Sequence, residues 1–130
     1  MENNEKDKGI RILVADDEVE FASTLVTRLQ LRKFQARMVN SGIDALAAID
    51  EEVPDILLLD LKMPDLDGLE VLAKLRESYP HLKVVILTGH GSFEAGREGM
   101  ELGAFDYIMK PVDLNRLIAI VKSACGDSKA

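Results

Sequence analysis

Five polar residues at the ends of short apolar runs could do chemistry together. Two adjacent acids, a third acid, a hydroxyl and an amine occupy these places: Asp16, Asp17, Asp60, Thr88 and Lys110. Carboxylates with room for water suit Mg²⁺, while an amine and a hydroxyl can neutralise and hold a transferring phosphoryl group. A carboxylate can also attack phosphorus to give an acyl phosphate. Each residue alone is commonplace at a strand end, but their joint placement predicts phosphoryl transfer if the fold brings them together.

Strands and helices are predicted in strict alternation. Short apolar runs predict strands at 10–15, 55–60, 83–88 and 105–110, and the alternation of Phe34, Ala36 and Met38 predicts a strand at 34–39. Apolar residues at helical spacing predict the helices that follow each strand, which fall at 19–31, 40–52, 67–78, 92–102 and 113–124. Residues typical of helix ends agree with these bounds: Asn40 or Ser41, Ser92 and Asp113 as caps and Gly103 as a stop.

This alternation predicts an α/β fold with a five-stranded parallel sheet and helices on both faces. Right-handed crossovers limit the topologies to a few, and the common solution is strand order 2-1-3-4-5, the flavodoxin-like doubly wound sheet. In this order the strands that end at Asp16–Asp17 and at Asp60 are neighbours, ~4.8 Å apart. Three carboxylates then converge at the rim where such sheets bind ligands, and like charges so close raise one another's pKa or demand a cation.

Composition bounds the class of protein. The 130 residues suit one domain, expected at 10–125 between flexible polar tails at 1–9 and 126–130. With 16 Lys and Arg against 23 Asp and Glu, the net charge of −7 disfavours non-specific nucleic-acid binding, which depends on neutralising phosphates. A single cysteine, Cys125, expected as a buried or half-buried hydrophobe, fits a reducing compartment. No apolar run approaches the ~20 residues of a spanning helix, so we expect a cytoplasmic protein that does not bind membranes.

Four motifs together resemble the receiver domain of two-component response regulators. They are "DD" at 16–17, "DLKMPDLDG" at 60–68, "LTGHG" at 87–91 and "YIMKP" at 107–111, and the resemblance covers roughly residues 10–124. It implies a signalling domain that catalyses only its own phosphorylation and dephosphorylation, rather than an enzyme with a separate substrate. It also implies two partners: a histidine kinase or phosphotransfer domain that donates the phosphoryl group, and an effector that the sequence does not name.

The resemblance assigns the phosphoacceptor and the metal ligands. Asp60 at the end of the third strand is the residue that takes the phosphoryl group. Mg²⁺ is bound directly by Asp17 and Asp60 and by the backbone carbonyl of Lys62. Asp16 reaches the ion through a water molecule. The resemblance therefore implies Mg²⁺ as the cofactor.

The resemblance also assigns the residues that respond to the phosphoryl group. Thr88 hydrogen-bonds it, Lys110 offsets its charge, and Tyr107 is the aromatic that changes rotamer, so that Thr88 and Tyr107 form the switch. The Lys110–Pro111 bond resembles the cis linkage of the family. The face that reports phosphorylation comprises the fourth helix, the fifth strand and the fifth helix.

The fourth predicted helix, 92–102, contains two glycines. Gly96 and Gly99 each cost about 0.8–1 kcal/mol relative to Ala in a helix interior. Phe93, Gly96 and Met100 share a spacing that would face the sheet. We expect this helix to be the least protected of the five and to change its order when the domain is phosphorylated.

Other interpretations of these segments mostly fail because residues that their motifs require are missing. A calcium loop at "PDLDG" would need an acid at Met63 and a glutamate at Lys74. A dinucleotide site at "GHGSFE" would need a glycine at Glu94. A metal-dependent aspartyl phosphatase would need an acid at Lys62. One alternative stays open, a pseudo-receiver that docks partners without being phosphorylated.

Overall fold

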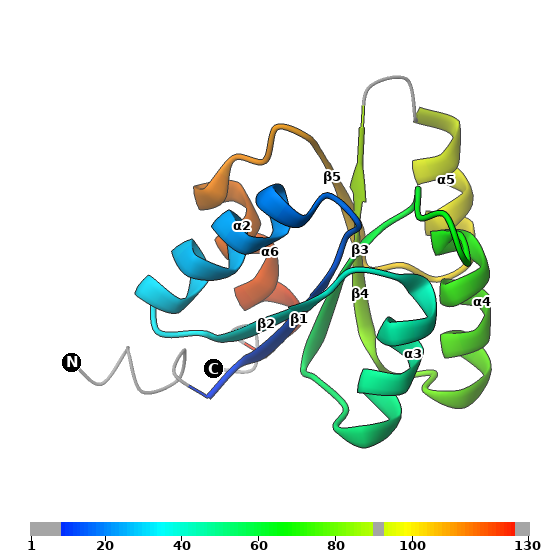
Figure 1. The fold of residues 1–130 in the computed structure, drawn as a ribbon, viewed down its shortest axis with the longest axis horizontal. Helices are drawn as coiled ribbons and strands as arrows, with labels where there is room; N and C mark the ends of the chain where they lie inside the picture. The colour runs from blue at the N-terminus through cyan, green and yellow to red at the C-terminus, as the bar shows by residue number, and fades with distance from the viewer. Residues whose placement is uncertain (1–8, 90–92, 127–130) are drawn as a thin grey trace.

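The five predicted strands form one parallel sheet in the computed structural model, which describes residues 9–89 and 93–126 (Figure 1). In chain order the strands are β1 (Arg11–Ala15), β2 (Gln35–Val39), β3 (Ile56–Asp60), β4 (Lys83–Thr88) and β5 (Asp106–Met109). Their order in the sheet is β2-β1-β3-β4-β5, with every pairing parallel. The predicted fold and strand order are confirmed. Most of both expected tails, and the expected cap Ser92, lie outside the described residues.

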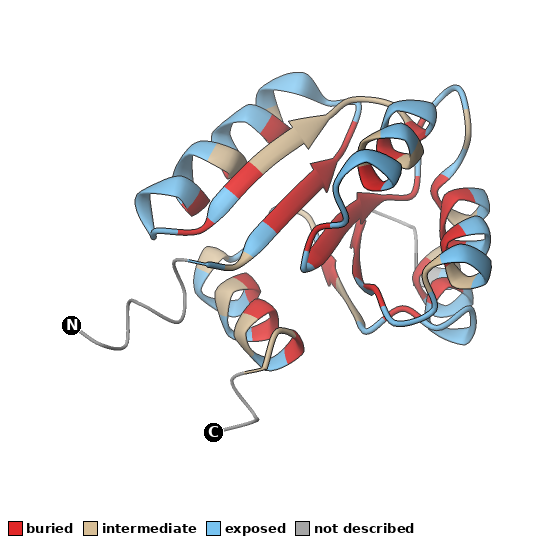
Figure 2. Cartoon of the chain, turned by 90° about the horizontal axis from the view of Figure 1, so that it is seen from below, coloured by how far each residue is buried: buried red, intermediate tan, exposed pale blue. Residues whose placement is uncertain are grey.

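The described residues form five helices, which cover the two faces of the sheet (Figure 1). They are α2 (Val19–Leu31), α3 (Gly42–Glu51), α4 (Gly68–Ser78), α5 (Phe93–Glu101) and α6 (Leu114–Ala124). Side chains alternate between the faces of a strand, so Ile12 and Val14 pack with α2 and α6. Leu13 and Ala15 pack on the opposite side with α3 and α4. The central strands are buried on both faces and the helices only on their inner sides, as Figure 2 shows.

Helix ends follow the chemistry of the sequence. Ser41 begins α3 and its hydroxyl accepts a hydrogen bond from the Asp44 backbone N–H, so of the two candidate caps the serine is confirmed. Asp113 begins α6 and accepts from two backbone N–H groups. Gly103 follows α5 with a φ of +100°, a conformation that favours glycine. The predicted caps in the described part of the chain therefore fix where these helices begin and end.

The inward face of α5 differs from the predicted one. Met100 is 38% exposed, and the Phe93 side chain lies outside the described part of the chain. Gly96 is buried as predicted, and Gly99 is buried in place of Met100. A Cβ added at Gly99 would lie 2.0 Å from Cδ1 of Ile86 in β4. The glycine therefore allows α5 to approach the sheet closely, which turns the neighbouring methionine outward.

Two further expectations, on Cys125 and on the Lys110–Pro111 bond, are met in the described part of the chain. Cys125 is half-buried against the core that α6 helps to form, and burial raises the pKa of its thiol to about 11. No described helix is long and apolar enough to cross a membrane. The Lys110–Pro111 peptide bond is cis, as the resemblance implied.

Candidate functional site

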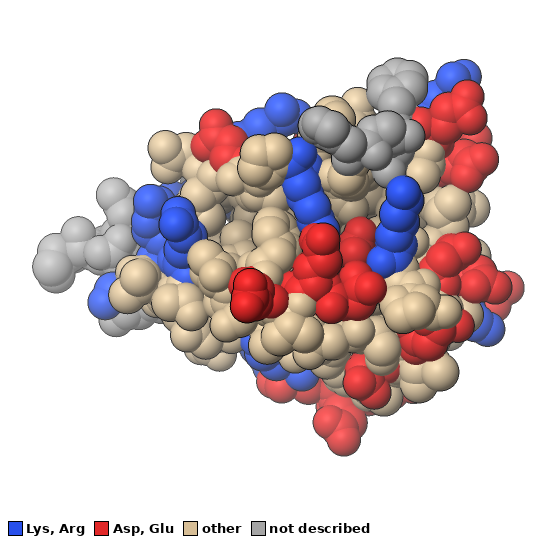
Figure 3. Space-filling model, turned by 45° about the horizontal axis from the view of Figure 1, so that its top comes forward, with Lys and Arg blue, Asp and Glu red and all other residues tan. Residues whose placement is uncertain are grey.

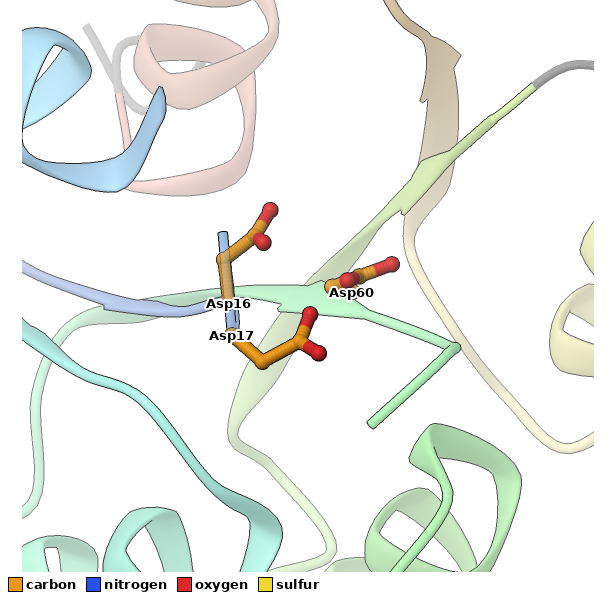
Figure 4. Close-up of side chains that lie close together, drawn as sticks. All are labelled: Asp16, Asp17 and Asp60. Atoms are coloured by element: carbon orange, nitrogen blue, oxygen red, sulfur yellow. The ribbon is translucent and has the colours of Figure 1, made fainter. Parts of the chain in front are cut away.

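Acidic side chains gather at the rim formed by the carboxyl ends of the strands, with basic side chains beside them (Figure 3). Asp16 and Asp17 follow β1, and Asp60 ends β3. The register pairs Ala15 with Leu59, so these two neighbouring strands end at the same level. One carboxylate oxygen from each acid lies within 4.8 Å of the other two (Figure 4). The predicted convergence of three carboxylates is therefore present.

The three acids differ in exposure and in their partners. Asp16 is fully buried and Asp60 is 5% exposed, whereas Asp17 faces solvent. Asp16 Oδ1 accepts a hydrogen bond of 2.8 Å from the Glu18 backbone N–H, and its own carbonyl accepts one from Asn40 Nδ2. Asp60 Oδ1 accepts a 3.2 Å bond from the Lys62 N–H. Asp17 is thus the member of the cluster most open to an incoming ion.

Burial makes the ionised form of Asp60 unfavourable. Desolvation first, and then the Asp16 carboxylate, raise the pKa of Asp60 from 3.8 to about 7. The Lys62 N–H and the Lys110 ammonium oppose that shift without cancelling it. The cluster therefore gains from a proton or a cation. Three carboxylates that offer only oxygen atoms, one of them exposed, match the ligand preference of Mg²⁺.

Lys110 follows β5 and reaches this cluster. Its Nζ lies 2.6 Å from Glu18 Oε1, 2.9 Å from Asp16 Oδ2 and 3.9 Å from Asp60 Oδ2. The Phe21 ring adds a cation–π contact at 4.5 Å. Burial lowers the pKa of Lys110, but the contacts with Glu18 and Asp16 outweigh burial, and the net shift is upward. The lysine is therefore held as a cation at the edge of the site.

Thr88 and Tyr107 meet at one position of α5. Thr88 ends β4 and is 3% exposed, and Tyr107 lies half-buried in the neighbouring β5. A Cβ added at Gly96 would lie 3.5 Å from Thr88 Cγ2 and 3.5 Å from Tyr107 Cδ2. A Cβ added at Gly89, which follows Thr88, would meet nothing within 4 Å. The threonine thus borders open space on one side and connects to α5 on the other.

The loop that carries Lys62 is fixed by a contact that the sequence pattern did not indicate. Asp65 accepts hydrogen bonds of 3.0 and 2.9 Å from the backbone N–H groups of Gly42 and Ile43, at the start of α3. These bonds, with that from Ile43 the larger influence, lower the pKa of Asp65. The Asp65 carboxylate therefore ties the loop after β3 to the start of α3.

Gly68, the first residue of α4, has no room for a side chain. A Cβ added there would lie 2.5 Å from Leu61 Cα and 2.7 Å from the Asp60 carbonyl oxygen, and both are backbone atoms. We therefore expect Gly68→Ala to lower the free energy of unfolding by about 1–3 kcal/mol, as overpacking does. Urea unfolding would measure the loss.

Gly89→Ala is the matched control for that substitution. It makes the same chemical change at a position where the added Cβ would meet nothing within 4 Å. We expect the control to unfold at a urea concentration near that of the wild type. Equal unfolding midpoints for the two variants would contradict the assigned packing of Gly68.

The sheet and its acidic rim define a doubly wound α/β domain with a carboxylate site at the topological switch point. The family model described as response regulator receiver domain matches residues 12–122. The chain belongs to the response regulator receiver domain family. The family predicted from the four motifs is therefore confirmed.

The similar proteins include much longer regulators. The chain is 36% identical over 114 residues to the regulatory protein AtoC of Escherichia coli, covering 88% of this chain and 25% of AtoC. It is 35% identical over 113 residues to the DNA-binding transcriptional regulator NtrC of Proteus hauseri, covering 87% of this chain and 24% of NtrC. The chain thus spans about a quarter of the length of these curated relatives.

Solved structures give the same result. A response regulator receiver domain protein from Clostridium thermocellum has a TM-score of 0.87 and 31% identity, covering 92% of this chain and 97% of that chain. NtrX from Brucella abortus in complex with ADP has a TM-score of 0.87 and 34% identity, covering 93% of this chain and 28% of that chain. The fold of the described residues is therefore that of a receiver domain.

Proposed function

We propose that this domain takes a phosphoryl group onto Asp60, with Mg²⁺, from a histidine kinase or phosphotransfer domain. One observation above all supports the proposal. A nearly buried carboxylate at a strand end lies beside two further carboxylates and a lysine, in a family of phosphoacceptor domains. A charged group at this depth is costly unless it is paired or used. Phosphoryl transfer uses all of these groups at once.

Each residue would have its own role in the phosphoryl transfer. An Asp60 carboxylate oxygen attacks phosphorus, the bond from phosphorus to the donor nitrogen breaks, and an acyl phosphate forms on Asp60. Lys110 and Thr88 would then hold the phosphoryl oxygens by charge and by a hydrogen bond. The proposal is consistent with their places: Lys110 Nζ lies 3.9 Å from Asp60 Oδ2, and Thr88 borders open space at Gly89.

The metal set is part of the same proposal. Asp17, Asp60 and the backbone carbonyl of Lys62 would hold Mg²⁺ directly, and Asp16 would do so through water. When bound, Mg²⁺ offsets negative charge on the phosphoryl oxygens. The exposure of Asp17 and the crowding of three carboxylates support this assignment.

Intact-mass spectrometry tests the function. The wild-type chain is incubated with a small phosphodonor, in Mg²⁺ or in EDTA. We expect the mass of one phosphoryl group to appear only with Mg²⁺. The alternative of a pseudo-receiver docking module predicts an unchanged mass under both conditions, and that result would overturn the proposal.

We further propose that phosphorylation acts on the face made by α5, β5 and α6, where an effector would read it. A phosphoryl group adds a charge of about −2, which would draw in Thr88. Thr88 and Tyr107 both lie against Gly96 of α5, so movement of either side chain would change the packing of that helix. Domain bounds of 10–125 fit this proposal, because α6 ends at Ala124.

Amide hydrogen exchange should therefore report the switch in α5. This helix has nine described residues with two glycines, whereas α2 has 13 and none, so we expect α5 to exchange faster in the unphosphorylated domain. Beryllofluoride, a phosphoryl mimic, should change that rate, with α2 as the internal control. Protection of α5 equal to that of α2, and unaltered by the mimic, would contradict the proposed switch.

A further inference from the structure

Glu18 is an unusual residue for the place it occupies. It is the N-cap of α2, where Ser, Thr, Asp and Asn are preferred, and its side chain makes no capping hydrogen bond. The N-caps of α3, α4 and α6 all accept such bonds through their side chains: Ser41, Asp67 and Asp113. The Glu18 carboxylate instead lies 2.6 Å from Lys110 Nζ, across 92 residues of sequence. The Glu18 side chain therefore pairs with Lys110 and does not cap α2.

The lysine is correspondingly drawn toward α2. Glu18 Oε1 at 2.6 Å and Asp16 Oδ2 at 2.9 Å are its two nearest anions, and the Phe21 ring is 4.5 Å away. Asp60 Oδ2 lies at 3.9 Å, beyond the length of a hydrogen bond. In the unphosphorylated domain, the phosphoacceptor is therefore the most distant of the three carboxylates around this ammonium.

We propose that Glu18 is a positioning residue that holds Lys110 toward α2 and competes for it with the phosphoryl group on Asp60. This inference rests on the proposed function. A phosphorylated Asp60 carries about two negative charges, enough to draw the lysine away from a single exposed carboxylate. The Glu18 side chain is 63% exposed, so its hold on Lys110 is modest and can be broken. Asp16, fully buried, can keep its contact while the lysine turns.

The competition has a measurable consequence. Glu18→Gln keeps the shape of the side chain and removes its charge, so the lysine is freer to meet the phosphoryl group. Exposed ion pairs are worth about 0.2–1 kcal/mol, which corresponds to a change in affinity of up to about fivefold. We therefore expect Glu18→Gln to bind beryllofluoride, in the presence of Mg²⁺, about two- to fivefold more tightly than the wild type.

Two controls separate this effect from a general change in charge. Glu20→Gln removes the same charge from the first turn of the same helix, but Glu20 makes no ion pair with Lys110. We expect its beryllofluoride affinity to equal that of the wild type. In a Lys110→Ala background, Glu18→Gln should have no effect on beryllofluoride affinity, because the lysine that Glu18 holds is then absent.

The contact itself has a readout that needs no phosphoryl group. In nitrogen NMR of the unmodified domain, Glu18→Gln should shift the Lys110 Nζ resonance and speed the exchange of its ammonium protons, whereas Glu20→Gln should do neither. An unshifted resonance in Glu18→Gln would overturn the inference alone. So would equal tightening in both Gln variants, or tightening that persists without Lys110. A wild-type domain that binds no beryllofluoride and gains no phosphoryl mass would overturn the proposed function, and the competition with it.

Discussion

Replacing Asp60 with asparagine is expected to abolish Mg²⁺-dependent phosphorylation of this domain. The amide is nearly the same size as the carboxylate, so the β3 end and its neighbours keep their packing. It lacks the anionic oxygen that would attack phosphorus. Intact mass after incubation with a phosphodonor and Mg²⁺ measures the outcome, which we expect to be a complete loss of the phosphoryl mass rather than a slower gain.

Asp44→Asn is a suitable control for that experiment. Asp44 lies exposed in the first turn of α3 and outside the carboxylate cluster. This variant should gain the phosphoryl mass as the wild type does. If Asp60→Asn also gained it, the acceptor would have to be another residue, and Asp17, the exposed acid of the cluster, would be the first to examine.

The layout of the site could be predicted because it follows from periodicity. Short segments with a strand pattern, each followed by a helical pattern, leave one reasonable sheet, and the carboxyl ends of parallel strands share one rim. Asp60 and the pair at 16–17 end neighbouring strands, so their convergence needed only the strand order. The particular roles of Lys62, Thr88 and Tyr107 came from the family resemblance instead.

Contacts between side chains on different elements could not be predicted in the same way. Glu18 and Lys110 are separated by 92 residues, and their pairing depends on how α2 begins and how the chain leaves β5. The bond from Asp65 to the start of α3 depends likewise on the path of a loop. A long side chain at an N-cap was the one available signal, since glutamate is a poor cap.

Glycine was the other source of error. Sequence periodicity counts apolar side chains and so predicts Met100 as an inward position, whereas Gly99 lies on the buried face of α5 beside Gly96, which was predicted there. A glycine leaves no hydrophobic signal, yet it can mark the closest approach of two elements. Gly99 against Ile86 and Gly68 against the Asp60 carbonyl are such approaches. The structural role of these glycines can be recognised only from the distances between an added Cβ and its neighbours.

The pH dependence of stability provides the second large expected effect. The pKa of Asp60 is raised from 3.8 to about 7, chiefly by burial and then by Asp16. Between these two values the folded domain keeps a proton that the unfolded chain has already lost. Stability therefore falls as pH rises through this range. The lowered pKa of Asp65 acts in the opposite direction and at lower pH, because its ionised form is favoured by folding.

Comparison with Asp60→Asn measures the contribution of this carboxyl together with its electrostatic interactions with Asp16 and Lys110, because the two chains otherwise share every titrating group. We expect the free energy of unfolding of the wild type, relative to that variant, to fall by on the order of 2 kcal/mol between about pH 5 and about pH 8 in EDTA. Urea unfolding at the two pH values measures it. Mg²⁺ should reverse the loss at the higher pH, since it binds the folded cluster of carboxylates and not the unfolded chain. A difference between wild type and variant that does not change with pH would mean that Asp60 ionises as freely in the folded domain as in the unfolded one, and would contradict the raised pKa of Asp60.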